Sequence, residues 1–539
     1  MHTNWMARLR AAVLSAPVLV AGVAAGMAMF DLGALVFANN DEARFAVLAR
    51  DMLARGDWWF PQLNGVVYQN KPLLFAWLIA ALSWPFGHVA TLTAVAPSIA
   101  AGIGLALVVY AAGQRMFGSE GGRVAGLIVA TSQGFVIHAR LGMPDMLLTL
   151  FIALALWQGW RLVRERPWAR LGFYGATGLA FWTKGPAGLL PLLIMIIWAL
   201  AGDRRRRLAL LRLRSGLALL IVIVAPWPLI GLVGHPDILR NAVMTDQLAW
   251  YARRDVRLAT MLAPLQNAFG ILFPWVVLAP AVGVQALRTL RGRGTERDAI
   301  GLLVVWSTVT FVAVGLSSQQ RVRYYLPLLP PMALLTGWWV AGVVVWRRAV
   351  VRMPWRVYGV VSGALLVAGV LTVAARRDLV IDLVTTWLRW LSLALLVSTV
   401  GLAAVLAVVL APSRQRRRVA FTLACVIAAL AAAGAYRADL HRPTGQQFRR
   451  LAARVQPLTG DNGAVVAWDV ADLPLSFYLG RPIVRVHSGL AVSDALEARA
   501  AVAVVAERTI RVAGNPEGTA VLARSRLGPQ RLIVLTNER

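Results

Sequence analysis

Charged residues of both signs gather in the first polar stretch that follows the N-terminal apolar run. Asp41 and Glu42 form an adjacent pair of carboxylates, and Lys71 follows in the segment Gln69-Asn70-Lys71-Pro72. A carboxylate can act as a general base toward a hydroxyl group, and a lysine ammonium can neutralise a phosphate that is bound or leaving. These residue types suit chemistry on a phosphate-bearing substrate.

Lysine is rare in this chain. Of 55 Lys and Arg residues, only Lys71 and Lys184 are lysines. Where nearly every cation is arginine, a retained lysine indicates a need for a compact ammonium rather than a planar guanidinium. A genomic bias toward arginine that missed two codons is the alternative. We favour function, because the topology derived below puts both lysines on the same side of the membrane as the acidic residues.

Two further segments carry groups for the same site. Asp145 begins an apolar run directly after a proline, where helix capping alone could explain it, but a carboxylate at a membrane boundary is costly unless it is used or paired. Arg321 and Arg323 precede Tyr324 at the mouth of another apolar run, and two arginines in this position suit phosphate binding.

Loop 234–266 is also dense in charged and aromatic residues. Its arginines could bind an anion, or they could form a solvated basic loop whose side chains reach the membrane surface. The arginines concerned are Arg253, Arg254 and Arg257.

A helix should position the first carboxylates. Phe45, Leu48 and Met52 recur at helical spacing after Asp41, and charged residues occupy the other face. The pattern predicts a helix that lies in the membrane interface and begins with Asp41 as its N-cap. Capping is therefore the alternative to a catalytic role for Asp41.

Composition identifies a polytopic membrane protein. The chain has 539 residues, 58% of them hydrophobic, and a mean hydropathy of +0.64. Its net charge of +30 comes mostly from short basic clusters between apolar runs, which is the positive-inside pattern rather than a nucleic-acid site. The single cysteine and six scattered histidines predict no disulfide and no metal site, and without a nucleotide-binding motif we expect no cofactor.

The basic clusters also fix the expected topology. If all fourteen apolar runs crossed the membrane, the clusters at 204–207, 288–297 and 414–418 would fall outside. Run 72–87 is short and interrupted by Pro85 and Gly87, so we expect it to be a juxtamembrane or re-entrant helix. About thirteen spans remain, and the N-terminal run 11–38 is long enough to be a retained anchor rather than a cleaved signal.

The chain changes character near residue 437. Charged residues become more frequent, and short strand-like runs alternate with helical stretches. The sequence predicts a transmembrane domain over 1–436, with its first outer loop at 39–90, and a small α/β domain over 437–539 on the same outer face.

Several motifs resemble the bacterial aminoarabinose transferases and their relatives. These belong to the glycosyltransferase superfamily with the C-type membrane fold, families 39 and 83, which includes the protein O-mannosyltransferases. The motifs are Asp41 to Phe45, Gly56 to Gly65, Asn70 to Leu73, Arg140 to Asp145, Thr183 to Pro186, Phe273 to Trp275 and Tyr324 to Pro331.

The resemblance implies transfer of a sugar from an undecaprenyl (polyprenyl) phosphate donor at the periplasmic face of the bacterial inner membrane. By position, Asp41, Glu42 and Asp145 look like the catalytic carboxylates, and Lys71 resembles the lysine that holds the donor phosphate. Tyr324 sits where a phosphate-contacting tyrosine lies. The other implied or candidate phosphate ligands are Arg253, Arg254, Arg257, Arg321 and Arg323, and the remaining site candidates are Lys184 and Asp57.

One departure bears on the substrate. The aminoarabinose transferases typically have glutamate, associated with a structural zinc site, where this chain has Asn70. Lipid A or lipopolysaccharide is the expected acceptor, with a protein or another glycan as the alternative. A flippase for lipid-linked sugars is the alternative from a different class, although a transporter should place ionisable residues near the bilayer midplane. A non-catalytic subunit of an envelope assembly is a third hypothesis.

Overall fold

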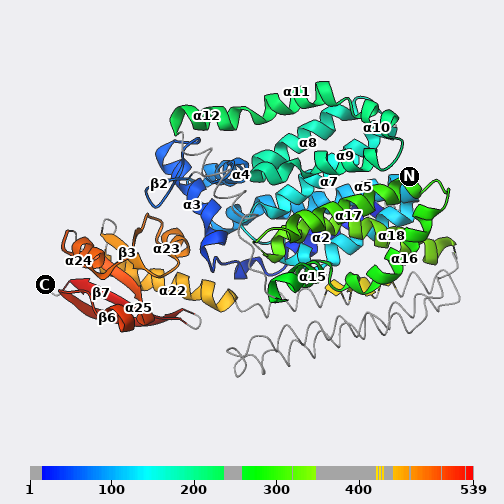
Figure 1. Cartoon of the computed structure of the whole chain (residues 1–539). Coiled ribbons are helices and arrows are strands. Elements are labelled where there is room, and N and C mark those ends of the chain that lie inside the picture. Colours follow the sequence, from blue (N-terminus) through cyan, green and yellow to red (C-terminus); the bar gives the residue numbers. More distant parts are fainter. Residues whose placement is uncertain are drawn as a thin grey trace, which may run out of the picture.

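The computed structural model describes residues 15–235, 258–346 and 441–537, apart from short gaps at 69, 165, 319, 460–462, 499–500 and 528–529, together with parts of 421–429. A body of helices occupies most of the chain, and a smaller unit of strands and helices lies beside one end of it (Figure 1). Arg253, Arg254, Arg257 and the expected spans at 356–374 and 387–411 lie outside the described residues.

The first apolar run is shorter as a helix than the sequence suggested. Helix α2 covers Ala16–Met29, and a 3-10 turn follows at Leu32–Ala34. The backbone leaves the helix because Phe30 is extended and Asp31 adopts a left-handed conformation with φ of 54°. The last third of the predicted run 11–38 therefore leads irregularly into the first loop.

The first loop contains two helices and a small hairpin. Helix α3 (Asn40–Arg55) ends at Gly56, strands β1 (Gln62–Leu63) and β2 (Val66–Val67) pair antiparallel, and α4 (Leu74–Ser83) continues into a 3-10 turn at Trp84–Phe86. At about 1.5 Å per residue, the apolar segment Leu74–Phe86 is roughly 20 Å long, too short for a hydrocarbon layer of about 30 Å.

The prediction that Asp41 caps α3 was wrong. Asn39 is the N-cap, and its side-chain oxygen accepts a hydrogen bond from the backbone N–H of Glu42 at 3.1 Å. The carboxylate of Glu42 in turn accepts bonds from the Ala38 backbone N–H at 2.9 Å and from the Asn39 amide at 2.7 Å. This reciprocal arrangement resembles a capping box and leaves the Asp41 carboxylate available for other contacts.

The remaining helices of the body follow in chain order. They are α5 (Thr91–Thr131, interrupted by non-helical Gly118), α6 (Gln133–His138), α7 (Asp145–Arg164), α8 (Ala169–Lys184), α9 (Leu190–Leu200), α10 (Arg204–Leu211), α11 (Leu213–Val224), α12 (Pro226–Gly234), α15 (Leu258–Leu272), α16 (Ala279–Arg291), α17 (Arg297–Gly315) and α18 (Leu329–Trp346). Gly118 can adopt its φ of 81° because it has no Cβ, and this lets α5 turn back on itself.

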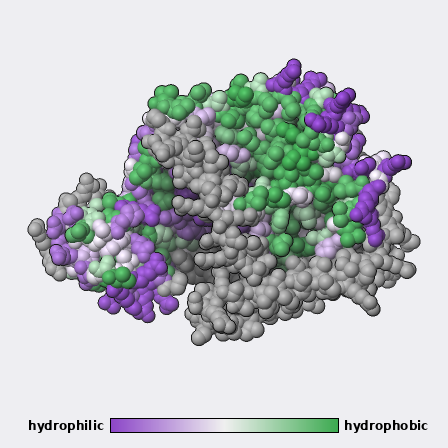
Figure 2. Space-filling view, viewed as in Figure 1, coloured by the Kyte–Doolittle hydropathy of each residue, from purple (hydrophilic) through white to green (hydrophobic). Residues whose placement is uncertain are grey.

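Length and composition identify a polytopic membrane protein. Within the described ranges, five helical stretches are long and apolar enough to cross a bilayer: Thr91–Thr131, Asp145–Arg164, Ala169–Leu200, Arg204–Gly234 and Arg297–Gly315. Figure 2 shows a continuous hydrophobic surface over the body, with hydrophilic side chains at its far end and on the smaller unit. An exposed apolar surface of this extent belongs in lipid.

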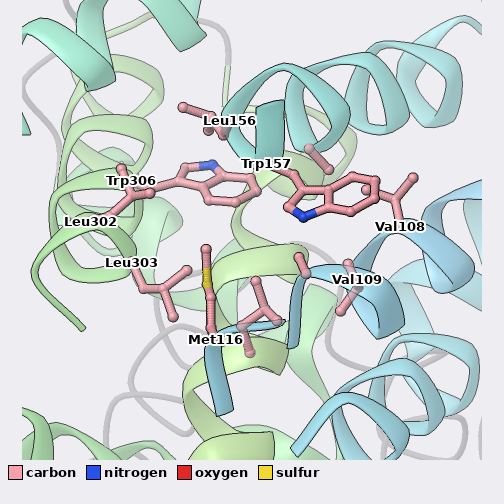
Figure 3. A pocket seen from close by; sticks show the side chains of 11 residues that line it. Val108, Val109, Met116, Leu156, Trp157, Leu302, Leu303 and Trp306 are labelled. Carbon is pink, nitrogen blue, oxygen red and sulfur yellow. The ribbon is translucent and has the colours of Figure 1, made fainter. Parts of the chain in front are cut away.

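The interior of the body is filled with apolar side chains. Helices α5, α7, α17 and α18 enclose a cavity of only ≈ 10 Å³, with the indole rings of Trp157 and Trp306 among its walls (Figure 3). That volume is about one water-sized sphere, and all of its lining residues are apolar or aromatic. This part of the bundle is a packed core and offers no route for a sugar.

The smaller unit is a five-stranded mixed sheet with helices. The strand order is β4-β3-β5-β7-β6; β3 is parallel to β4 and β5, whereas β7 is antiparallel to β5 and β6. The strands are β3 (Ala464–Trp468), β4 (Val484–Val486), β5 (Ala501–Ala506), β6 (Thr519–Leu527) and β7 (Gln530–Asn537). The helices are α22 (His441–Thr459), α23 (Asp472–Leu479), α24 (Gly489–Ala498) and α25 (Glu507–Ala513).

Helix α23 joins this unit to the first loop. The Asp472 carboxylate accepts hydrogen bonds from the side-chain amides of Asn40 at 2.9 Å and Asn64 at 2.7 Å. The Leu473 backbone N–H donates to the Asn40 side chain at 3.1 Å, and Arg50 donates to the backbone oxygen and hydroxyl of Ser476 at 2.5 and 2.9 Å. We call these contacts the α3–α23 latch.

The latch changes the interpretation of α3. The sequence predicted a polar face exposed in the interface, but Arg50 on that face binds α23, and burial lowers its pKa to about 10. Helix α3 is therefore covered on both faces, by the membrane body and by the smaller unit.

Replacing Asp472 with alanine should loosen the latch. The change removes the acceptor of two partly buried amide donors, which costs about 1–3 kcal/mol when they are left unpaired. Hydrogen–deuterium exchange of the full-length protein in detergent should show faster exchange in α3 and α23. Asp494→Ala, at an exposed position on α24, is the matched control. Equal exchange in both variants would contradict the latch.

Candidate active site

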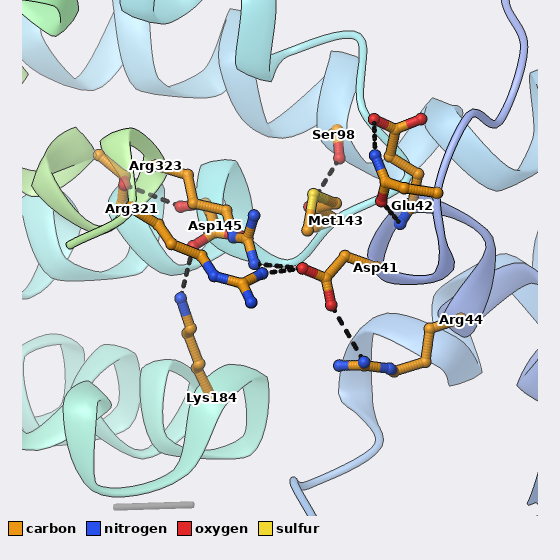
Figure 4. Close-up of polar contacts among 11 residues, drawn as sticks. Asp41, Glu42, Arg44, Ser98, Met143, Asp145, Lys184, Arg321 and Arg323 are labelled. Carbon is orange, nitrogen blue, oxygen red and sulfur yellow. Dashed lines mark hydrogen bonds and ion pairs between the residues drawn. The ribbon is translucent and has the colours of Figure 1, made fainter. Parts of the chain in front are cut away.

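Two carboxylates and four cations meet at one end of the helical body (Figure 4). The Asp41 carboxylate contacts Arg323 at 2.7 Å and Arg44 at 3.0 Å, and it is also paired with Arg321. The Asp145 carboxylate contacts the Lys184 ammonium at 2.5 Å, and the Arg323 Nε lies 3.8 Å from its other oxygen. Arg323 thus bridges the two carboxylates. We call these six residues the Asp41–Asp145 cluster.

The cluster is assembled from four separate parts of the chain. Asp41 and Arg44 lie near the N-terminus of α3, Asp145 begins α7, and Lys184 ends α8. Arg321 is the N-cap of the 3-10 helix η6 (Val322–Leu328), and Arg323 lies within that helix. The sequence predicted that Asp41, Asp145, Lys184, Arg321 and Arg323 share one face of the membrane, and the structure brings all five into contact distance.

The loop before α7 is held against the start of α3. Ser98 donates a hydrogen bond from its hydroxyl to the Met143 carbonyl at 3.0 Å. A Cβ at Gly142 would lie 3.1 Å from the Phe37 ring and 3.2 Å from the Glu42 carbonyl, so the loop can approach α3 this closely because residue 142 is glycine. These contacts fix the distance between the two carboxylates.

Arg140 secures the same loop, although the sequence analysis assigned it no role. Its side chain is buried, and its guanidinium donates hydrogen bonds to the carbonyls of Ala28 at 3.3 Å and Asp31 at 3.1 Å while lying 4.2 Å from the Phe30 ring centroid. Arg140 therefore neutralises the negative end of α2. The signal available in the sequence was a charged residue between two apolar runs.

Tyr324 lies against the cationic side of the cluster. The Lys184 ammonium is 4.2 Å and the Arg323 guanidinium 5.2 Å from the centroid of its ring, which are cation–π distances. Burial raises the pKa of the Tyr324 hydroxyl, so the phenol is neutral at physiological pH. The predicted phosphate ligand is thus close to both carboxylates but is not itself charged.

The cluster carries a surplus of positive charge. Among the residues that the structure describes, Arg44, Lys184, Arg321 and Arg323 form ion pairs with Asp41 and Asp145 only, which gives the group of six a net charge of +2. Burial raises the pKa of Asp41, but the guanidinium groups of Arg323, Arg44 and Arg321 outweigh that effect, and the net pKa lies below its usual 3.8. Asp41 is therefore an anion at neutral pH.

The other predicted site residues have different surroundings. Lys71 is half-buried in the segment between β2 and α4, beside the exposed Asn70. Glu42 is engaged with the backbone of Ala38 and the side chain of Asn39, as described above. Asp57 accepts bonds from the backbone N–H groups of Trp59 at 3.1 Å and Phe60 at 2.9 Å, and so holds the turn after α3. Over the described ranges, no group of three or more His, Cys, Asp or Glu side chains could hold a metal ion.

Comparison with known proteins identifies a resemblance over most of the chain. Residues 70–230 match the family of dolichyl-phosphate-mannose-protein mannosyltransferases. A Pseudomonas fluorescens undecaprenyl phosphate-alpha-4-amino-4-deoxy-L-arabinose arabinosyl transferase is 30% identical over 309 residues, which cover 55% of this chain and 54% of the relative. In sequence, the chain thus spans about half the length of the curated relatives it matches.

The fold is similar over a longer stretch. The crystal structure of ArnT from Cupriavidus metallidurans bound to undecaprenyl phosphate superposes with a TM-score of 0.72 at 19% identity, covering 99% of this chain and 98% of that one. The resemblance to the aminoarabinose transferases is confirmed. An archaeal oligosaccharyltransferase from Archaeoglobus fulgidus, solved with an inhibitory peptide and a dolichol-phosphate, shares the fold more distantly, with a TM-score of 0.57 at 12% identity over 92% of this chain and 69% of that one.

Loss of a cationic partner should destabilise the folded protein more at Asp145 than at Asp41. Lys184→Met leaves the buried Asp145 beside a single distant cation and should lower the free energy of unfolding by about 3–5 kcal/mol. Arg44→Met removes one of three partners of the more exposed Asp41 and should cost about 0–1 kcal/mol. Thermal unfolding in detergent measures both.

The double variant Asp145→Asn/Lys184→Met separates charge from packing. It removes both members of the buried pair and should recover most of the stability lost in Lys184→Met. Equal destabilisation by Lys184→Met and Arg44→Met would show that the Asp145 pair is not the buried ion pair described here.

Proposed function

We propose that this protein is a membrane glycosyltransferase that transfers a sugar from an undecaprenyl phosphate donor to an acceptor at the outer face of the bacterial inner membrane. The observation that carries the proposal is the Asp41–Asp145 cluster, in which two carboxylates lie among four cations at the end of a membrane-embedded helical body. The names of the sequence relatives, which are aminoarabinose transferases, support the donor and the reaction class.

The charge of the cluster suits the leaving group. In the donor, the sugar is bound through a phosphodiester with one negative charge. When the bond between the sugar and the phosphate oxygen breaks, the lipid keeps a phosphomonoester with about −1.5 to −2 charges near pH 7. Two uncompensated positive charges therefore stabilise the product phosphate more than the ground state, which is the requirement for catalysis.

The reaction is written as a single displacement. An acceptor oxygen forms a bond to the anomeric carbon as the bond to the phosphate oxygen breaks, and the configuration is inverted. Asp41 orients the attacking oxygen or accepts its proton, and Asp145, fixed by Lys184, holds Arg323 in place. Lys71, Tyr324 and Arg321 assist the departing phosphate.

Asp41 and the donor phosphate compete for the same arginines. Three guanidinium groups hold the pKa of Asp41 below its usual value after burial has raised it, which makes the carboxylate a weak base. A phosphate that takes Arg321 and Arg323 would free Asp41 and strengthen it as a base. Binding of the donor thus prepares the carboxylate for the acceptor.

Glu42 has a positioning role in this scheme rather than a catalytic one. Its carboxylate already accepts two hydrogen bonds at the start of α3, from Ala38 and Asn39. Asp57 similarly holds a turn. Both residues shape the first loop that carries Asp41 and Lys71.

The proposed orientation puts the cluster and the unit 437–539 in the periplasm, with thirteen spans in total. Support comes from the opposite end of the body, where the arginine-rich helix α10 lies (Figure 1) and where Arg207 and Arg164 pair with Asp298 at 2.7 and 3.1 Å. The positive-inside rule assigns an end of this kind to the cytoplasm.

Lipid A is the acceptor we favour, in an aminoarabinose-like transfer; the names of the sequence relatives support the aminoarabinose donor of that transfer. The family match over residues 70–230 favours protein O-glycosylation as the second candidate. Mass spectrometry of lipid A and of envelope glycoproteins from a deletion strain distinguishes the two. A flippase is disfavoured because the ionisable cluster lies at one boundary while α5, α7, α17 and α18 pack around an apolar cavity.

Substitution of the central residues should abolish transfer without unfolding the protein. Asp41→Asn and Lys71→Ala should each lower kcat by about 10²-fold or more, because one loses the acceptor carboxylate and the other a phosphate cation. Turnover of an undecaprenyl phosphate sugar by purified protein is the assay. Asp203→Asn, which retains a capping side chain at the opposite end of the body, is the control. Full activity in both site variants would refute the mechanism.

The pH dependence of kcat/KM for the donor, which reports the donor-free protein, should be insensitive to Asp41. Because its pKa in the free protein lies below 3.8, the carboxylate stays ionised from about pH 8 down to about pH 5. The ratio of kcat/KM between the wild type and Asp41→Asn should therefore be constant over this range. A ratio that falls toward 1 as the pH decreases from 7 to 5 would show that Asp41 titrates with a raised pKa instead.

A further inference from the structure

A pocket of ≈ 660 Å³ opens between α5 and the C-terminal end of α7, away from the Asp41–Asp145 cluster. Helix α5 forms one wall, and the end of α7 with the segment after it forms the other. Its polar and aromatic lining residues are Gln114, Arg115, Ser119, Trp157, Arg161 and Arg166. We call this feature the α5–α7 pocket. The mechanism above makes no use of it.

The length of α7 puts the pocket near the membrane surface opposite the candidate active site. Asp145 begins this helix, and Arg161 lies in its last turn, roughly 24 Å away at about 1.5 Å per residue. The hydrocarbon layer of a bilayer is about 30 Å thick. The two ends of α7 therefore reach opposite surfaces, and the α5–α7 pocket lies at the level of the lipid headgroups.

The Arg161 guanidinium is held in place at the pocket. It donates a hydrogen bond to the Gln158 side-chain oxygen at 3.0 Å and lies 5.4 and 4.8 Å from the ring centroids of Trp157 and Trp168. The Arg166 guanidinium lies 5.9 Å from the Trp168 ring, and its backbone N–H donates to the Arg161 carbonyl at 2.9 Å. Arginines held over aromatic rings lose less freedom when they bind an anion.

The charge of the pocket is positive. Within the part of the chain that the structure describes, no carboxylate forms an ion pair with Arg161 or Arg166. Glu165 adjoins Arg166 in the sequence and lies outside the described residues. Counting its charge against the three lining arginines still gives a net charge of +2. Guanidinium groups bind phosphate oxygens through paired N–H donors, so a phosphate is the anion that suits this pocket.

An apolar surface adjoins the pocket. Trp168, whose ring contacts both Arg161 and Arg166, is exposed, and so are Leu171 and Leu179 on α8. At about 100° per residue these three side chains lie on one face of the helix, which leads from the pocket into the hydrocarbon layer. Tryptophan and arginine side chains in this position are typical of the headgroup region. A ligand with both a phosphate and an acyl chain fits the two surfaces together.

We propose that the α5–α7 pocket binds the phosphate of an anionic phospholipid from the leaflet opposite the candidate active site, with an acyl chain along the exposed face of α8. The bound lipid would join α5 to the connection between α7 and α8. These two helices carry Asp145 and Lys184 at their other ends, so the lipid would stabilise the helix pair that holds the buried ion pair. Binding of this kind needs no turnover and goes beyond the proposed function.

The test compares charge removal inside and outside the pocket in the full-length protein. The pocket variant is Arg161→Gln/Arg166→Gln. The control is Arg204→Gln/Arg205→Gln, which removes the same charge from two exposed arginines at the start of α10, at the same end of the body. Arg166→Gln alone leaves Arg161 packed on both indole rings, and so provides a variant whose fold is preserved if the double variant is destabilised.

Binding is measured by native mass spectrometry of purified protein in neutral detergent micelles to which phosphatidylglycerol or phosphatidylcholine is added. The pocket variant should bind phosphatidylglycerol about tenfold more weakly than the wild type, and Arg166→Gln about threefold, because charge-assisted hydrogen bonds to the phosphate are lost. The control should stay within about twofold of the wild type. Phosphatidylglycerol should raise the melting temperature of the wild type and the control more than that of the pocket variant.

Equal binding of phosphatidylglycerol by the wild type, the pocket variant and Arg166→Gln would overturn the inference. An equal loss in the control would also overturn it, because the protein would then respond only to the total charge of this end. Displacement of the lipid by free glycerol phosphate at the same concentration would assign the pocket to a soluble phosphate instead. Because the assay needs no sugar donor, failure of the proposed function would leave its outcome unchanged.

Discussion

The position of Arg323 between two carboxylates is the interaction on which the candidate site depends. One guanidinium lies 2.7 Å from Asp41 and 3.8 Å from Asp145, and thereby ties the first loop to the start of a membrane-embedded helix. Neither carboxylate could remain ionised at a membrane boundary without such partners. The remaining cations, Lys184, Arg44 and Arg321, complete a group whose net charge is positive and whose members come from four segments.

Much of this arrangement could be predicted from the sequence. Counting basic clusters on either side of apolar runs placed Asp41, Asp145, Lys184, Arg321 and Arg323 on one face, because the positive-inside rule restricts how the runs can be threaded. The scarcity of lysine drew attention to Lys184, and the structure pairs it with Asp145 at 2.5 Å. The short length of run 72–87 and its interruption by Pro85 and Gly87 likewise indicated that this segment is too short to cross the membrane.

The parts that could not be predicted depend on contacts between distant residues. Asn40 and Asp472 are separated by 432 positions, and nothing in either neighbourhood indicates the other. The same holds for Arg140, whose partners Ala28 and Asp31 lie more than a hundred positions earlier. The error about the cap of α3 was local. Asn39 and Asp41 are both good N-cap residues, and the choice between them depended on Glu42 reaching back to the Ala38 backbone.

The α3–α23 latch also has a consequence for the modularity of the chain. Asn40, which the latch holds, is the residue next to Asp41 in sequence, so two hydrogen bonds join the immediate neighbour of the Asp41 carboxylate to the smaller unit. A recombinant chain that exchanged residues 437–539 for those of a relative would retain its geometry only if Asn40, Asn64 and the incoming counterpart of Asp472 were exchanged as a set. The set of residues that must be kept together in such an exchange is therefore discontinuous in sequence, one loop near the beginning together with one unit near the end.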